Sequence, residues 1–307
     1  MKHAGWVPFE DYYPEQDGDW YRRQMLGMLN HAAIALRVTF AGEPRFGWRD
    51  RSVGVSVVDD DYRDAGWLRL VAEAADRDVT RFWDGNATAS AARCAMRTPR
   101  VWRSWSFDES ATRYHADVMD YVDEAVCSAS AALVGMPALS ETWWAWLPGV
   151  LSALELAETG RYAVDFDQFA DRVRIWDKYL PVTVERWVPA HGDLHWGQLT
   201  TASCWWLDWE GWGLAPEGFD VASLYLHSLA VPQMAEQIRL RYAKQLDSRD
   251  GMFSQLYLAN RMLARGDCDD HPCGQALYPH VGTLLDALDA SPDAYAMFRS
   301  PAHGPQP

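Results

Sequence analysis

Lysine is scarce in this sequence. Only Lys2, Lys178 and Lys244 occur among 307 residues, and 28 lysine and arginine side chains stand against 43 aspartate and glutamate side chains, for a formal net charge of −15. A protein that binds nucleic acid through phosphate contacts needs a surplus of cationic side chains. The composition therefore argues against a nucleic-acid partner and mildly favours a cationic one.

Cysteines and long apolar runs are also few. The five cysteines are an odd number at scattered positions, which argues against a disulfide scaffold and indicates a reducing compartment. No run approaches the length of about 18 apolar residues that a membrane-spanning helix needs. The first residues show no basic stretch followed by an apolar one. We therefore expect a cytoplasmic protein with no membrane partner.

Apolar and aromatic residues are plentiful. The chain is 49% hydrophobic and contains 17 tryptophans, several of them in pairs such as Trp143-Trp144 and Trp205-Trp206. Large aromatic side chains mostly serve burial, so these residues predict a sizeable core. The length suits one large domain or two lobes.

The first third of the chain predicts a small antiparallel sheet with a leading helix. Residues 19–36 have apolar side chains at helical spacing. Alternating valines within 52–59 and the apolar segment 67–73 predict two strands of a hairpin across the polar turn between them. A second strand pair is predicted at 99–106 and 112–122.

From about residue 123 onward the sequence is mostly helical. A helix over 140–159 would be capped by Ser140, and one over 165–180 by Asp165. Further helices are predicted at 219–230, 233–247, 251–265 and 275–290. The expected architecture is α+β, with an N-terminal lobe at 1–122, a helical C-terminal lobe at 123–307 and a ligand cleft between them.

Two acidic clusters follow apolar segments in the middle of the chain. Asp193 stands in His-Gly-Asp after Trp-Val-Pro-Ala, and Asp208 follows Trp-Trp-Leu. This placement predicts two acids brought together at the end of a short hairpin. Phosphoryl transfer needs one carboxylate for the proton of the acceptor and another for Mg²⁺, with a further side-chain oxygen on the metal. Asp193 is the expected base, and Asp208 and Gln198 are the expected metal ligands.

This segment resembles the motif of the aminoglycoside phosphotransferase and choline kinase-like family, which has the protein kinase fold. The family motif is His-Gly-Asp, four residues and Asn, followed by an aspartate after an apolar strand. Here the sequence is HGDLHWGQ, then WWLDWE and GFDVASLY. The resemblance implies that His191 braces the catalytic loop and that Asp220 holds its backbone. It also implies ATP or GTP as the phosphoryl donor and Mg²⁺ as the metal.

The resemblance assigns further positions to the nucleotide and the acceptor. Backbone groups of Met119 and Tyr121 would lie beside adenine, and Gly47 would belong to a loop over the phosphates. His195 and Trp196, which follow the base, would face the acceptor.

The sequence departs from the family pattern in its small lobe and at its metal site. Position 198 is Gln, whose side chain is one methylene longer than that of the Asn in the family motif. No lysine lies on the strand where these kinases place one, and Arg69 stands at the matching position. The following helix, predicted at 86–97, contains no acid, so Glu73 is a candidate partner for Arg69. The glycines around Gly47 are sparse.

The predicted function is transfer of the γ-phosphoryl group to a hydroxyl of a small molecule or peptide. Acidic residues late in the chain, at 247, 250, 267, 269 and 270, are compatible with a cationic acceptor such as an aminoglycoside. The two departures also allow a pseudokinase that acts through a protein partner. A third interpretation is an iron oxygenase with His191, Asp193 and either His227 or His280 as ligands.

Overall fold

The computed structural model describes residues 18–59, 65–76, 83–92, 97–264 and 273–288. The chain divides into two compact units. Unit 1 holds the described residues of Met1–Ala91 and Pro99–Asp123, and unit 2 holds those of Ala92–Thr98 and Glu124–Pro307. An antiparallel sheet in unit 1 and helices in unit 2 confirm the predicted α+β class.

Unit 1 is built on one antiparallel sheet with the strand order β1-β3-β4-β6-β5, and β2 pairs with β3. The predicted hairpins are present: β3 pairs with β4, and β5 with β6. The polar turn is predicted at 59–66, but Asp59 ends β3 and Ala65 begins β4; residues 60–64 lie outside the described residues. The strands are β1 (Val38–Phe40), β2 (Arg45–Phe46), β3 (Ser52–Asp59), β4 (Ala65–Ala74), β5 (Val101–Glu109) and β6 (Thr112–Asp120).

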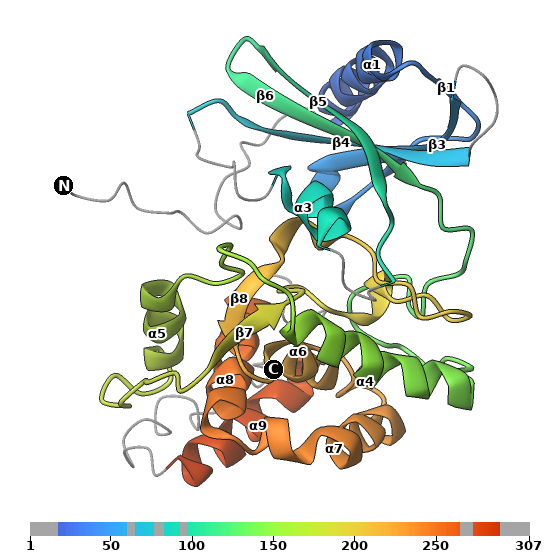
Figure 1. The fold of residues 1–307 in the computed structure, drawn as a ribbon. Helices are drawn as coiled ribbons and strands as arrows, with labels where there is room; N and C mark the ends of the chain where they lie inside the picture. Colours follow the sequence, from blue (N-terminus) through green and yellow to red (C-terminus); the bar gives the residue numbers. More distant parts are fainter. Residues whose placement is uncertain (1–17, 60–64, 77–82, 93–96, 265–272, 289–307) are drawn as a thin grey trace, which may run out of the picture. The chain divides into compact units, whose positions relative to one another are not determined.

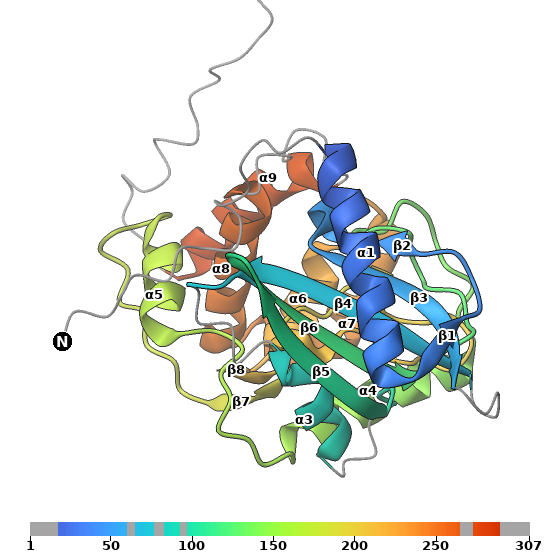
Figure 2. The same ribbon diagram turned by 90° about the horizontal axis from the view of Figure 1, so that it is seen from above.

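Helix α1 (Gly18–Leu36) lies across one face of this sheet (Figure 2). Apolar side chains at helical spacing on α1, such as Met25 and Leu29, share a core with alternate residues of the strands, such as Val55 and Leu68. Because strand side chains alternate between faces, Arg69 lies on the opposite face of the sheet. The short helix α3 (Gly85–Ala91) contacts β5.

Unit 2 combines a two-stranded sheet with packed helices (Figure 1). Strand β7 (Trp187–Ala190) pairs with β8 (Gly213–Pro216), α4 (Glu141–Glu155) packs on β7, and α8 (Arg249–Ala264) packs on α5, α6, α7 and α9. Buried tryptophans such as Trp143 and Trp206 fill its interior, as the composition predicts. The other helices are α5 (Phe166–Arg174), α6 (Phe219–Leu226), α7 (Pro232–Leu246) and α9 (Gly274–Ala287).

The predicted helix caps are present, but several helices end earlier than predicted. Ser140 accepts a hydrogen bond from the Trp143 backbone N–H, and Asp165 accepts one from Gln168. Helix α5 ends at Arg174 instead of 180. Just beyond its end, the Asp177 carboxylate accepts a hydrogen bond from the Tyr179 backbone N–H, which favours a turn over a continued helix. Helix α4 ends at Glu155 instead of 159. Within the described ranges, none of the helices has both the length and the apolar character to span a membrane.

Candidate active site

The loop that contains Asp193 follows β7, and the strand that pairs with β7 differs from the predicted one. Strand β7 pairs with β8, not with the apolar residues 205–207. Residues 205–207 instead pair back onto 198–200: Leu199 and Trp206 form a β-bridge, and the Leu207 backbone N–H donates to the Gln198 carbonyl at 2.9 Å. Residues 198–207 thus form a second hairpin. Asp208 follows it directly, so the backbones of Gln198 and Asp208 lie at the same end of this hairpin.

Gly192 is required by the local backbone. It has a φ of +82°, and a Cβ at this position would lie 2.6 Å from the Gly211 carbonyl oxygen and 2.7 Å from the Ala163 Cβ. Only glycine adopts such a conformation at little cost and leaves this space open. The turn that presents Asp193 therefore depends on a missing side chain one residue before it.

Asp220, in the first turn of α6, holds the backbone turn at His191 and Gly192. Its carboxylate accepts hydrogen bonds from the backbone N–H groups of His191 at 2.7 Å and Gly192 at 3.0 Å. Burial raises the pKa of Asp220, while His191 and the two backbone donors act in the opposite direction. These are the contacts that a supporting residue would make.

His191 joins the two acidic segments. Its Nε2 lies 3.0 Å from the Leu207 carbonyl oxygen, next to Asp208. Its ring is fully buried, and the centroid lies 4.7 Å from that of Trp209. Because the bond to the carbonyl requires a proton on Nε2, it fixes the tautomer of the neutral ring.

Asp193 is paired with an arginine that the sequence does not single out. Arg261, in the last turn of α8, donates from Nη2 to Asp193 Oδ1 at 2.7 Å. On the other oxygen, Oδ2, Asp193 lies 3.9 Å from His195 Nε2. Residues 193 and 261 are far apart in sequence, so only the packing of α8 brings them together.

The two residues expected to face the acceptor have different environments. Trp196 is fully buried, donates from Nε1 to Ser228 Oγ at 2.9 Å and stacks on Trp143. Its side chain therefore belongs to the core of unit 2 and does not face an acceptor. His195 is half-buried, and its Nδ1 accepts from the Gly197 backbone N–H.

The pair Gln198 and Asp208 fits a hard metal ion. Among the described residues, the buried Gln198 Oε1 has no hydrogen-bond partner. Asp208 has a left-handed backbone (φ 59°, ψ 66°), a conformation that aspartate tolerates better than most residues. A carboxylate and an amide oxygen are ligands that Mg²⁺ prefers, and Mg²⁺ needs only one or two such groups beside phosphates and water.

The iron-site interpretation has no support in the described part of the chain. No group of three or more His, Cys, Asp and Glu side chains there could hold a metal ion. Nδ1 of His227 lies 2.8 Å from the Ser223 carbonyl oxygen, and Nε2 of His280 lies 2.8 Å from Gln255 Oε1. Neither histidine joins His191 and Asp193 in a ligand set.

In unit 1, Arg69 lies in the middle of β4. It is half-buried and stands opposite Gly54 of β3 and Asp117 of β6 in the strand register. Asp117 is 1% exposed and accepts from Ser104 Oγ at 2.6 Å and, more weakly, from Asn86 Nδ2 of α3 at 3.5 Å. The described helix α3 carries Asn86 and no acid, so a buried carboxylate near Arg69 comes from a neighbouring strand.

The other expected nucleotide positions also lie in unit 1. Met119 is buried on β6, and Tyr121, just beyond that strand, is 39% exposed. Gly47 begins the turn between β2 and β3, and its N–H donates to the Ser52 carbonyl. Both Arg49 and Asp50 in this turn have positive φ. The turn is attached to α1, because Arg22 Nε donates to Asp50 Oδ2 at 2.6 Å.

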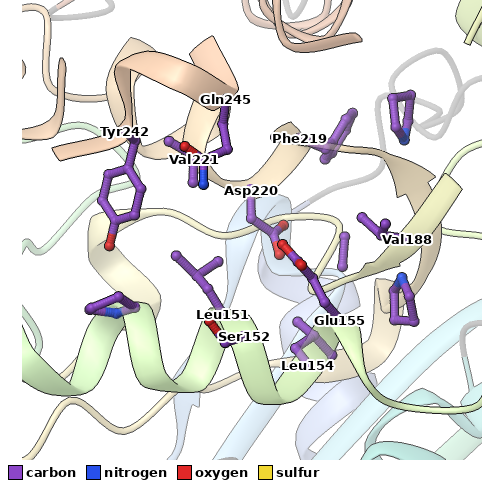
Figure 3. Close-up of a pocket in the computed structure, with 15 residues that line it drawn as sticks. Leu151, Ser152, Leu154, Glu155, Val188, Phe219, Asp220, Val221, Tyr242 and Gln245 are labelled. Atoms are coloured by element: carbon purple, nitrogen blue, oxygen red, sulfur yellow. The ribbon is translucent and has the colours of Figure 1, made fainter. Parts of the chain in front are cut away.

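Asp220 also lines a pocket in unit 2 (Figure 3). Leu151 and Glu155 line it from α4, Val221 from α6 and Tyr242 from α7. Burial and the neighbouring carboxylates of Glu217 and Asp220 raise the pKa of Glu155, while Arg186 lowers it. The pocket contains Asp220 but none of Asp193, Gln198 and Asp208.

The fold is similar to solved structures of kinases. A spectinomycin phosphotransferase in complex with ADP and spectinomycin has a TM-score of 0.50 and 10% sequence identity, over 90% of this chain and 94% of that chain. An ethanolamine kinase from Plasmodium vivax has a TM-score of 0.37 and 11% identity, over 94% and 90%. A choline/ethanolamine kinase family protein from Mesorhizobium loti has a TM-score of 0.42 and 12% identity, over 87% and 99%.

Neither a protein-family model nor a curated protein sequence matches the chain. At such identities the structural likeness shows the fold. The likeness to the spectinomycin phosphotransferase confirms the predicted kinase-like fold with a β-rich N-terminal part and a helical C-terminal part.

Proposed function

We propose that this protein is a phosphotransferase that moves the γ-phosphoryl group of ATP or GTP to a hydroxyl of a small molecule. The proposal rests on how the candidate residues are arranged around the hairpin of residues 198–207. Asp193, Gln198 and Asp208 stand on two segments joined by His191, and Asp220 holds the turn before Asp193. A kinase-like fold with this set of oxygens suits phosphoryl transfer.

In the proposed reaction the acceptor oxygen forms a bond to the γ-phosphorus while the bond from that phosphorus to the bridging oxygen breaks. The acceptor proton passes to the carboxylate of Asp193, and the nucleoside diphosphate leaves with the bridging oxygen. Asp208 and Gln198 would hold Mg²⁺, which neutralises charge on the phosphate oxygens when bound.

Unit 1 would bind the nucleotide. Arg69 is proposed to contact the phosphates, where its guanidinium can form a fork that a lysine cannot. The backbone of Met119 and Tyr121 is proposed to lie along adenine, and the turn at Gly47 over the phosphates. These assignments follow from the family resemblance and from the kinase-like fold.

The late acidic residues give a cationic acceptor little support. Asp247 is paired with Arg239 at 2.6 Å. Asp250 is buried and accepts from the backbone N–H groups of Glu185 and Arg186. The remaining three acids, at 267, 269 and 270, lie outside the described residues. The charge of the acceptor therefore has to be inferred from the surroundings of Asp193.

The proposal is tested by calorimetric titration with ATP and GTP, with and without Mg²⁺, on the wild type and on Asp208→Ala. Mg²⁺-dependent binding that is lost in Asp208→Ala supports a working nucleotide site. Asp247→Ala, which removes an acid of unit 2 that is paired with Arg239, is the control and should bind like the wild type. Absence of binding for both nucleotides would overturn the proposal and favour a pseudokinase that acts through a protein partner.

A further inference from the structure

The ion pair between Arg261 and Asp193 places a positive charge on the proposed base. The two side chains are 22% and 36% exposed, so the pair lies at a surface that a ligand can reach. A partly exposed ion pair of this kind contributes little to stability. Its position beside the reacting group therefore suggests a role in binding.

The ion pair with Arg261 makes the Asp193 carboxylate a poor site for a cationic acceptor. One carboxylate oxygen is bound by Arg261, and His195 faces the other at 3.9 Å. A carboxylate that is already neutralised attracts an ammonium group weakly, whereas a guanidinium binds carboxylates and phosphates through paired donors.

Resting on the proposed function, we propose that the acceptor carries an anionic group, a carboxylate or a phosphate, near the hydroxyl that is phosphorylated, and that Arg261 binds this group. When the anion takes the guanidinium, Asp193 Oδ1 becomes available to the hydroxyl proton. Substrate binding and release of the base are then the same event. A cationic or neutral alcohol cannot displace Arg261 in this way.

The test uses three probes of similar size that differ in charge: glycerate, glycerol and 3-amino-1,2-propanediol. Their binding is measured by saturation-transfer NMR, with and without Mg²⁺ and ADP, so that the readout does not require turnover. We expect the wild type to bind glycerate at least about tenfold more tightly than the other two probes, because a hydrogen bond to a charged group is stronger than one to a neutral group. Arg261→Gln should lose this preference, and Arg261→Lys should keep part of it.

Two further variants distinguish binding from a structural role. Asp193→Asn removes the negative charge that pairs with Arg261, so glycerate should compete with a weaker contact and bind more tightly than to the wild type, although turnover falls. Arg172→Gln is the control: it removes a positive charge of α5 that donates to Asn260, the residue before Arg261 on α8, and it should keep the preference for glycerate. Thermal melting of each variant verifies that it is folded.

The outcomes separate this inference from the proposed function. Equal binding of the three probes, the tightest binding of the amine, or an unchanged preference in folded Arg261→Gln would overturn the inference while nucleotide binding stood. If Arg261 instead contacts the γ-phosphate of the donor, Arg261→Gln would weaken ATP binding more than ADP binding, which also contradicts it. A preference for glycerate without nucleotide binding would support the anion site and reject the phosphotransferase.

Discussion

Asp220 and Gly192 are joined by a hydrogen bond of 3.0 Å from the glycine backbone N–H to a carboxylate that is buried in the core of unit 2. The other carboxylate oxygen accepts from His191 at 2.7 Å. The turn that presents Asp193 is thus held by one side chain from α6. A carboxylate is suited to this task because it can accept from two donors at once.

Asp220→Ala should therefore both destabilise the protein and reduce turnover. It leaves two buried N–H groups without an acceptor, and each costs about 1–3 kcal/mol of unfolding free energy. Urea unfolding measures this loss. Asp250→Ala is a matched control, because Asp250 is also buried and accepts from two backbone N–H groups, those of Glu185 and Arg186. It should lower stability similarly but leave turnover per folded molecule unchanged, and an equal loss of turnover in both variants would argue against a specific role for Asp220.

Asp193→Asn should reduce phosphoryl transfer about 10²- to 10⁴-fold, as expected when a general base is lost. Nucleotide affinity should stay close to that of the wild type, because in the proposed reaction Asp193 acts on the acceptor and not on the donor. Turnover is measured by release of the nucleoside diphosphate in the presence of an acceptor, and affinity by calorimetry. Turnover like that of the wild type would remove Asp193 from the role of base.

Gln198 can be tested as a metal ligand through its Oε1, which has no hydrogen-bond partner among the described residues. Gln198→Leu keeps most of the side-chain volume and removes the amide, so Mg²⁺-dependent nucleotide binding should weaken about tenfold or more. Gln198→Asn should preserve binding if the geometry of the family applies. A Mg²⁺ titration at fixed nucleotide measures both, with Gln233→Leu on the exposed part of α7 as the control. An unchanged Mg²⁺ affinity in Gln198→Leu would contradict the assignment.

His280 should make the stability of the protein depend on pH. Burial lowers the pKa of His280 to about 4, with a smaller contribution from Arg239. An unfolded histidine binds a proton below about pH 6.5, but the folded one does so only near pH 4. This contribution to stability is therefore complete above pH 6.5, and it is lost at up to about 1.4 kcal/mol per pH unit between 6.5 and 4.

The matched variant for this effect is His280→Gln. Its amide can still donate to Gln255 Oε1, which lies 2.8 Å from His280 Nε2, but it does not titrate. Urea unfolding at pH 7 and pH 5 should show a larger loss for the wild type than for the variant. Equal losses in the two proteins would mean that His280 is not responsible.

Much of the fold follows from local patterns in the sequence. The alternating valines of β3 and the helical spacing on α1 exist because each faces one core, so their periodicity reports burial. Caps such as Ser140 and Asp165 mark helix starts because the side chain satisfies a specific backbone donor. Helix ends are less predictable, as the turn around Asp177 shows.

The site itself was predictable only in part. The motif selects the two acids and Gln198 as candidates, but the apolar residues 205–207 suggested a strand paired with β7. They are apolar because Trp206 is buried in the core, and their backbone pairs with 198–200 instead. The contact between Arg261 and Asp193 depends on how α8 packs, a property of the tertiary structure that no local pattern contains.

Gly192→Ala should be the most damaging single methyl addition in the loop. The alanine would have to adopt a φ near +82° and place its Cβ 2.6 Å from the Gly211 carbonyl oxygen. Together these effects should lower the free energy of unfolding by about 1–3 kcal/mol or more, and they should displace Asp193 and reduce turnover. Gly211→Ala is the matched control, because no described atom lies within 4 Å of its added Cβ. Chemical unfolding and nucleoside diphosphate release measure both variants, and a Gly192→Ala protein as stable and active as Gly211→Ala would show that the turn does not require glycine.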